Sequence, residues 1–236
     1  MNTEPHIIKS DGYIGAWLNA AKLLVNEGDR FNLTIHVNDP TRTDERAADA
    51  FCHRRVSPAI HQSVYDVANT IFPAHSKFHE GTVDDFFHHY EKIYLRGQRR
   101  HPTAWGTYFL RLIRFGGAKE NQLRKILNGL TTWKSRPRAA FVMHLSSAET
   151  DSPRSLGAPC WQYAQFIRNE DNVLSMSAVY RSHDYFQKAL GNFMGLSRLL
   201  KFVCVHSGMT PGTLTCLSTY ASLQGQQSKT RKLLGI

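Results

Sequence analysis

The sequence has no long apolar run and few cysteines. Its apolar stretches fall short of the roughly 20 residues that a membrane-spanning helix needs, and its first residues lack the charged and apolar parts of a signal peptide. The four cysteines show no paired framework, which is typical of reduced thiols in a reducing compartment. We therefore expect a cytoplasmic protein with no membrane anchor. The cysteines are Cys52, Cys160, Cys204 and Cys216, of which the last two lie in apolar settings typical of a core.

Recognisable phosphate loops and metal-binding patterns are also missing. There is no glycine-rich loop of the nucleoside-triphosphatase type, and the twelve histidines form no convincing metal spacing, so we predict no metal site. A zinc nucleotide deaminase needs a histidine, a glutamate and two closely spaced cysteines. His89, Glu91 and Cys160 supply part of this set. Tyr163 stands where the second cysteine would be needed, which disfavours a deaminase.

Acidic residues are fewer than basic ones, which leaves a net charge of +10. Such a charge favours anionic ligands without specifying the anion. Basic clusters occur at residues 96–100, 134–138 and 228–232, and charge runs of this kind are commonly a solvated face. A nucleic-acid-binding protein that uses the first two clusters, with Trp105 or Trp133 for stacking, is an alternative. We do not favour nucleic acid as a partner, because the aromatic residues do not interleave with these charges.

The chain is long enough to bury one sizeable core, so we expect a single domain over residues 1–236. Alternation predicts a hairpin around a turn at 169–172, and a strand between Trp105 and Lys119. Together the elements indicate an α+β domain, a mixed β-sheet packed with helices on one side. Apolar residues at helical spacing predict helices over 13–25, 60–72, 83–94, 119–131 and 184–206. Alternating residues predict strands over 31–37, 139–145, 158–168 and 173–181.

The most informative segment runs from residue 159 to residue 192. A thiolate can attack a polarised carbon, a guanidinium with a hydroxyl can hold a phosphate, and an amide can read a base edge. These groups together predict a nucleotide-modifying enzyme. The segment contains Cys160, Arg181, Ser182, Asp184 and Asn192.

The order and spacing of these groups resemble the thymidylate synthase family. The core of that family reads Pro-Cys-His-x-x-x-Gln-Phe, then Gln-Arg-Ser-x-Asp, then Leu-Gly-x-Pro-Phe-Asn. This sequence has Pro-Cys-Trp-Gln-Tyr-Ala-Gln-Phe at 159–166 and Tyr-Arg-Ser-His-Asp at 180–184, with the asparagine eight residues further. The resemblance is strongest over 105–212. Segments 105–108, 121–130 and 135–138 resemble the Tyr-Gly motif, the Asp-Gln helix and the Ser-Arg-Arg motif of the family. Segment 192–200 resembles the helix that follows the family asparagine, and 209–212 resembles the loop after that helix.

The resemblance implies C5 methyl or hydroxymethyl transfer to a pyrimidine nucleoside monophosphate. Cys160 would add to C6 of the base, and 5,10-methylenetetrahydrofolate would be the cofactor that supplies the one-carbon unit. Arg181 and Ser182 would bind the phosphate, and Arg181 would also favour the thiolate. Asn192 would pair with the 3,4 edge of the base, and dUMP or UMP is favoured because related deoxycytidylate hydroxymethylases typically have aspartate there. Asp184 would organise water and contact the pterin.

The family likeness also implies an obligate homodimer whose protomers share arginines across the interface. Arg136 and Arg138 stand at the positions of these arginines, with Pro137 between them. Gln165 and Tyr220 are further candidate substrate ligands, although the ribose-binding His-x-Tyr motif around Tyr220 is degraded.

Structural roles are alternatives for three of the site residues. Cys160 is also interpretable as a small buried residue, because free cysteine is among the most buried residue types. Asn192 follows Gly191 and is interpretable as a cap or turn residue. Asp184 is interpretable as the N-cap of the helix predicted after it.

Departures from the family pattern leave a second function open. Gln62 replaces the glutamate general base of the family, and an amide cannot move protons as a carboxylate does; Asp66 or His61 are possible substitutes. The family's glycine-rich loop is reduced to residues 29–32. The C-terminal tail that closes over folate in the family is not found before Ile236, which favours water capture and a hydroxymethyl product. The alternative is a divergent nucleotide-binding relative without synthase activity.

Overall fold

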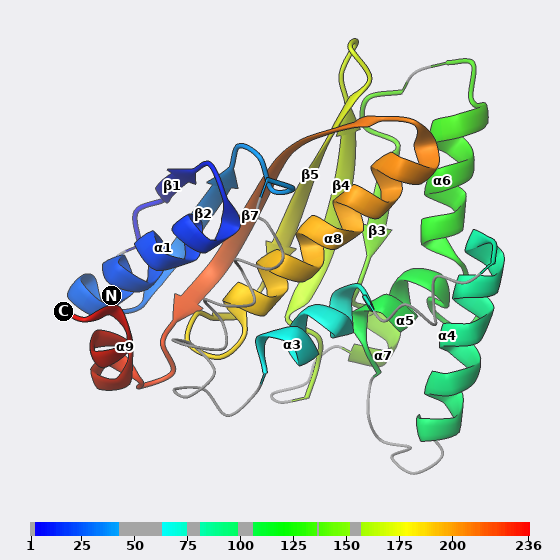
Figure 1. Ribbon diagram of the computed structural model, residues 1–236. Coiled ribbons are helices and arrows are strands. Elements are labelled where there is room, and N and C mark those ends of the chain that lie inside the picture. The colour runs from blue at the N-terminus through cyan, green and yellow to red at the C-terminus, as the bar shows by residue number, and fades with distance from the viewer. Residues whose placement is uncertain (1–2, 43–62, 75–80, 99–105, 136, 152–156) are drawn as a thin grey trace.

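A computed structural model describes residues 3–42, 63–74, 81–98, 106–135, 137–151 and 157–236. Helices and a mixed sheet form an α+β architecture, as predicted (Figure 1). The first part contains β1 (His6–Ser10), α1 (Tyr13–Glu27), β2 (Arg30–Val37), α3 (Val64–Ile71), α4 (Val83–Gln98), α5 (Tyr108–Ile113) and α6 (Gln122–Thr132). The second part contains β3 (Phe141–His144), α7 (Ala148–Asp151), β4 (Trp161–Arg168), β5 (Val173–Tyr180), β6 (His183–Asp184), α8 (Ala189–Ser207), β7 (Thr210–Ser222) and α9 (Gln227–Leu234).

Within the described residues the sheet has seven strands, and β7 lies near its centre. The order is β1-β2-β7-β5-β4-β3, and β6 pairs with β7 off this path. β4 and β5 form the predicted antiparallel hairpin, whereas β5 and β7 run parallel because α8 connects them. The short β6 is also parallel to β7, so that the turn before α8 is attached to the centre of the sheet.

The helices α1, α3, α5 and α8 lie on one side of the sheet, as Figure 1 shows. Every second side chain of β5 is buried toward this side, at Leu174, Met176, Ala178 and Tyr180. Burying side chains of this size contributes roughly 1.5–3 kcal/mol for each large one. α8 packs against β7, α1 and α3, and for this reason it is apolar around most of its circumference.

Two glycines let α3 lie directly against the first turns of α8. A Cβ atom at Gly191 would be 2.5 Å from the carbonyl oxygen of Val64, and one at Gly195 would be 2.8 Å from that of Ala68. Real Cβ atoms do not approach a backbone oxygen so closely, so the two helices touch because these side chains are absent. The contact brings one face of α3 next to Asn192.

Several predicted elements occur where the sequence indicated them. α1, β2, α6, β3, β4 and β5 overlap the predicted ranges, with ends that differ by a few residues, and α4 extends to Gln98. The helix predicted over 60–72 is described from Val64 onward, and residues 60–62 lie outside the described residues. No helix in the described ranges is long and apolar enough to cross a membrane.

The strand predicted between Trp105 and Lys119 is wrong, because α5 occupies that region. Thr107 starts the helix, since its Oγ1 accepts a hydrogen bond from the backbone N–H of Leu110 at 3.1 Å. Five of the six residues of α5 are buried. A run this short, with apolar residues at five of six positions, has no period that distinguishes a helix from a strand.

The helix predicted from residue 184 begins later, at Ala189. Asp184 belongs to β6, and its Oδ1 accepts backbone hydrogen bonds from Phe186 at 2.9 Å and Gln187 at 3.0 Å. These bonds hold a turn between β6 and α8. The prediction that Asp184 is the N-cap is therefore wrong, since Lys188 occupies that position, and Asn192 lies inside the helix rather than at a cap.

The segment 209–212, likened above to a family loop, is mostly strand, because β7 begins at Thr210. The strands β1, β6 and β7 and the helices α7 and α9 were not among the predicted ranges. β7 is rich in threonine and serine, and its half-buried outer face obscures the apolar alternation.

Candidate functional site

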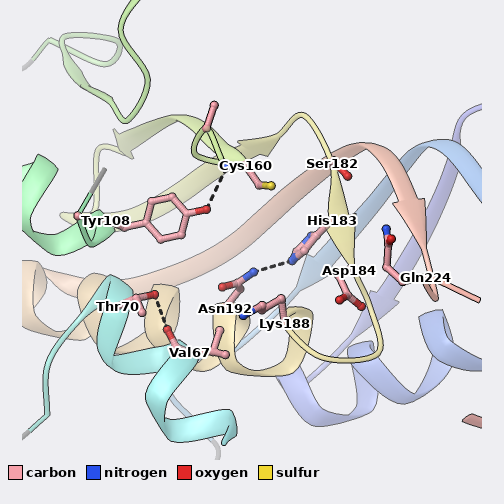
Figure 2. Close-up of a pocket in the computed structure, with 12 residues that line it drawn as sticks. Val67, Thr70, Tyr108, Cys160, Ser182, His183, Asp184, Lys188, Asn192 and Gln224 are labelled. Carbon is pink, nitrogen blue, oxygen red and sulfur yellow. Dashed lines mark hydrogen bonds between the residues drawn. The ribbon is translucent and has the colours of Figure 1, made fainter. Parts of the chain in front are cut away.

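A cavity of about 430 Å³ opens where the first turn of α8 meets α3, β6 and the segment before β4 (Figure 2). This volume lies in the range of small-molecule binding sites. The cavity brings together four residues that the sequence predicted for one site although they are up to 32 positions apart. They are Cys160, Ser182, Asp184 and Asn192.

Cys160 lies directly before β4, and hydrogen bonds hold its backbone in place. The hydroxyl of Tyr108 accepts hydrogen bonds from the backbone N–H groups of Cys160 at 3.1 Å and Trp161 at 3.2 Å. The carbonyl oxygen of Cys160 accepts from the backbone N–H of Arg181 at 2.9 Å. The residue is half-buried and lines the cavity, so it is not a core residue, whereas Cys204 and Cys216 are buried as predicted.

Opposing effects act on the thiol of Cys160. Burial is the largest and raises its pKa, and the carboxylate of Asp184 raises it further. Arg181, which hydrogen-bonds to the thiol, and Lys188 both lower the pKa. The net effect raises the pKa, and because the thiolate is the reactive form, the two cations increase the amount of nucleophile that burial would otherwise leave at neutral pH.

We expect Arg181→Met to shift the pH dependence of Cys160 alkylation to higher pH. Loss of the guanidinium removes an effect that lowers the thiol pKa, so less thiolate exists at any given pH. The measurement is the rate of iodoacetamide labelling against pH, read by mass spectrometry of the peptide that contains Cys160. Arg168→Met, at the far end of β4, is the control and should leave the curve unchanged. A midpoint that stays in place or falls would contradict this role of Arg181.

Residues 181–182 form a bend that leads into β6, and hydrogen bonds attach this segment to β7. The hydroxyl of Thr219 bonds to the carbonyl oxygens of Tyr180 at 3.1 Å and Arg181 at 2.6 Å. This anchoring places the Ser182 hydroxyl at the cavity, which Lys188 also lines, and burial lowers the pKa of Lys188. A hydroxyl and a cationic side chain that line one cavity can both donate hydrogen bonds to an anion.

Asn192 and His183 form a buried hydrogen-bonded pair at the inner end of the cavity (Figure 2). The amide nitrogen of Asn192 lies 3.0 Å from Nε2 of His183, and Nδ1 of His183 lies 2.9 Å from the hydroxyl of Ser218. Burial lowers the pKa of His183 to about 3, so the ring is neutral at physiological pH. A neutral imidazole has one donor and one acceptor nitrogen, and both are in use here.

The predicted phosphate ligand Arg181 is not among the residues that line this cavity, and its guanidinium donates a hydrogen bond to the carbonyl oxygen of Ala158 at 3.3 Å. The predicted ligands Gln165 and Tyr220 do not line the cavity either. The amide of Gln165 donates to the carbonyl oxygen of Ala139 at 3.0 Å and accepts from the hydroxyl of Tyr163 at 2.9 Å. The hydroxyl of Tyr220 donates to Asp29 at 2.6 Å. Both side chains are thus engaged elsewhere within this chain, and their roles stay predictions.

The predicted shared arginines and general-base position are described only in part. Arg138 is exposed, lies outside the cavity lining and pairs with Glu170 at 2.5 Å. Arg136 and Gln62 lie outside the described residues, and so do the alternative His61 and the cysteine Cys52.

Sequence reasoning did not assign to the site several residues that line the cavity, among them Tyr108, His183, Lys188 and Gln224. Tyr108 ends the segment likened to the Tyr-Gly motif, and Lys188 stands four positions before Asn192, a spacing that puts two residues on one helix face. His183 lies between two predicted site residues. Gln224 follows β7 and has no signal of this kind.

A zinc centre has no support in the described part of the chain. No group of three or more potential ligands is close enough there to hold a metal ion. His89 and Glu91 lie on α4 and do not line the cavity, and Glu91 pairs with Arg114.

Comparison with known proteins gives distant likenesses over most of the chain. No protein-family model matches the sequence. A protein of Methanococcoides burtonii named "Putative thymidylate synthase" is 25% identical over 217 residues, which are 92% of this chain and 88% of that protein. A protein of the same name from Methanosarcina mazei is 23% identical over 91% of this chain and 88% of that protein. Another from Methanosarcina barkeri is 28% identical over 57% of this chain and 59% of that protein. These identities give weak support to a thymidylate synthase-like family, with which the observed fold is consistent.

Proposed function

We propose that this protein transfers a one-carbon unit to C5 of a pyrimidine nucleoside monophosphate, with dUMP or UMP favoured. One observation carries the proposal: the thiol of Cys160, the hydroxyl of Ser182 and the amide of Asn192 line one cavity. The cation next to the thiol supports it further, because Arg181 can serve both the thiolate and the anion. The names of the archaeal relatives are consistent with this chemistry.

The nucleotide would lie across the cavity. Its phosphate would bind at Ser182 and Arg181, where hydroxyl and guanidinium donors are available. Its base would extend toward Asn192, at the buried end of the cavity. In this arrangement the ring would pass Cys160, which lies on the wall between the two ends.

Cys160 would act as a covalent catalyst. Its Sγ would form a bond to C6, and the electron pair of the C5–C6 double bond would make C5 nucleophilic. After C5 has been substituted, loss of its proton would expel Sγ and regenerate the thiolate. Asp184, whose pKa burial raises, would exchange protons with water during these steps.

The cavity is chemically suited to 5,10-methylenetetrahydrofolate as cofactor. Val67, Tyr108 and Ala158 provide apolar wall for a flat ring, and the carboxylate of Asp184 can accept hydrogen bonds from ring N–H groups. When bound, the cofactor supplies the one-carbon unit, and a methyl or a hydroxymethyl product follows from the chemistry of the later steps.

We further propose that the protein is a homodimer. The sheet face opposite the helices carries half-exposed side chains such as Ser177, Thr215 and Gln165, which offer a broad surface for a second copy. Arg136 and Arg138 of the partner subunit would complete the phosphate site. Arg138 could leave Glu170 at little cost, because exposed ion pairs typically contribute about 0–1 kcal/mol.

The direct test is tritium release from C5-labelled dUMP, UMP and dCMP in the presence of methylenetetrahydrofolate. We expect release with a uracil nucleotide, since C5 loses its hydrogen in both the methyl and the hydroxymethyl reaction, and the product mass distinguishes the two. Binding of the nucleotide without any release would reject synthase chemistry. That result would favour the alternative, a divergent relative that retains only the nucleotide pocket, in line with the raised pKa of the Cys160 thiol.

A further inference from the structure

Ring stacking and hydrogen bonds hold the buried side chain of His183 in one orientation. Its exposed fraction is 1%, and its ring stacks on Tyr180 with centroids 4.2 Å apart and an interplanar angle of 5°. Nδ1 lies 2.9 Å from the Ser218 hydroxyl, which lies 3.1 Å from that of Tyr185. Nε2 faces Asn192. The ring therefore cannot rotate without breaking the stack and two buried hydrogen bonds.

In the hydrogen bonds that link Asn192, His183 and Ser218, the donor and the acceptor of each bond can be assigned. The amide nitrogen of Asn192 faces Nε2 at 3.0 Å, and an amide nitrogen can only donate. Nε2 must then be the acceptor, which leaves the single ring hydrogen on Nδ1, where it is donated to Ser218. One hydrogen of the Asn192 amide is thus committed to His183, and the oxygen with the second hydrogen forms the edge available to a ligand.

We propose that His183 is a specificity-determining positioning residue, which holds the Asn192 amide in the orientation that accepts uracil and not cytosine. The proposal rests on the proposed function, since it concerns the base that the same cavity binds. Uracil presents a carbonyl acceptor beside an N–H donor, whereas cytosine presents an amino donor beside an acceptor nitrogen. The edge that Asn192 offers has a donor and an acceptor, and rotating the amide by half a turn exchanges them.

The ring tautomer decides between these two orientations. With the hydrogen on Nδ1, the amide nitrogen of Asn192 stays toward His183. With the hydrogen on Nε2, the amide oxygen would have to face the ring and the edge would match cytosine. A buried donor or acceptor without a partner costs about 1–3 kcal/mol, so the tautomer and the amide orientation change together. The sequence shows only a histidine between Ser182 and Asp184, with no sign of this role.

The first test reads the tautomer in the unmodified protein. Nitrogen-15 labelling of histidine and heteronuclear NMR should show a neutral His183 ring with its hydrogen on Nδ1, its signals being assigned by their absence in His183→Phe. A hydrogen on Nε2 would overturn the proposal, because the amide of Asn192 would then be reversed.

The second test measures calorimetric affinities for dUMP and dCMP. We expect the wild-type protein to prefer dUMP, and His183→Phe, which keeps a stacked ring but has no acceptor, to reduce that preference about tenfold because a free amide can rotate. Ser182→Ala is the matched control: it should weaken both nucleotides equally, since their phosphates are the same. If His183→Phe does not fold, His183→Gln replaces it, because its amide can donate or accept and should also reduce the preference.

The outcomes separate the two proposals. An unchanged preference in a folded His183 variant, or a wild-type preference for dCMP, would overturn the role of His183 and leave nucleotide binding intact. Failure of the wild-type protein to bind either nucleotide would reject the proposed function and the inference with it.

Discussion

Replacing Cys160 by alanine should reduce tritium release from C5-labelled nucleotide by roughly 10⁴-fold or more, the order of loss seen when a covalent nucleophile is removed from an enzyme. Without Sγ no bond to C6 can form, and C5 stays unreactive. Binding should persist, because in the proposed complex Ser182 and Asn192 would contact parts of the nucleotide that do not depend on the thiol. The measurements are the rate of tritium release and the calorimetric affinity for dUMP.

Cys204→Ala is the matched control for this substitution. Cys204 is a buried cysteine of α8 and does not line the cavity, so its replacement should leave release unchanged and cost about 1 kcal/mol of stability for the small void. Equal release by wild-type protein and Cys160→Ala would exclude the covalent mechanism. Loss of dUMP binding together with activity would instead indicate that Cys160 maintains the shape of the cavity.

Gly191→Ala should destabilise the protein by roughly 2 kcal/mol and weaken dUMP binding. The new Cβ would lie 2.5 Å from the carbonyl oxygen of Val64 and 2.6 Å from Cβ of Val67, so the contact between α3 and α8 must open. Overpacking of this kind costs about 3 kcal/mol at the upper end, and the better helix propensity of alanine offsets about 1 kcal/mol. Because Val67 lines the cavity, its displacement also changes the site. Urea unfolding and dUMP calorimetry measure the two effects.

The control for this prediction is Gly15→Ala in α1. Its Cβ would meet only the hydroxyl oxygen of Ser10 at 2.7 Å, and this flexible side chain can move. The same gain in helix propensity should therefore leave the protein as stable as before or slightly more stable. If Gly191→Ala were equally well tolerated, the close approach of α3 and α8 would not be needed for the fold or for the site.

The elements that the sequence predicted well depend on neighbours along the chain. The hairpin of β4 and β5 follows from alternation on both sides of a turn at 169–172, and α1 follows from its apolar spacing. The prediction that Cys160, Ser182, Asp184 and Asn192 share one site came from the types and spacing of their polar groups, which resemble one family, and these four residues line one cavity. For each of these the information lies within a short stretch of sequence.

The errors occur where distant contacts decide the structure. Five of the six residues of α5 are apolar and buried, and their packing against α3, α4 and α6 stabilises a helix where the sequence pattern did not distinguish it from a strand. The start of α8 was misplaced because pairing of β6 with β7 holds Asp184 in a strand. The roles of Gln165 and Tyr220 rest on the family resemblance and stay predictions, and their side chains bond elsewhere in this chain.

By itself the sequence determined the α+β class, the hairpin and the polar groups available to a site. Only the tertiary structure decided which of these groups share a cavity, that Tyr108 holds the backbone of Cys160, and that His183 directs the amide of Asn192. The physical reason is that local preferences depend on a few neighbouring residues. The orientation of a buried polar side chain instead depends on partners such as Ser218, 35 positions away along the chain.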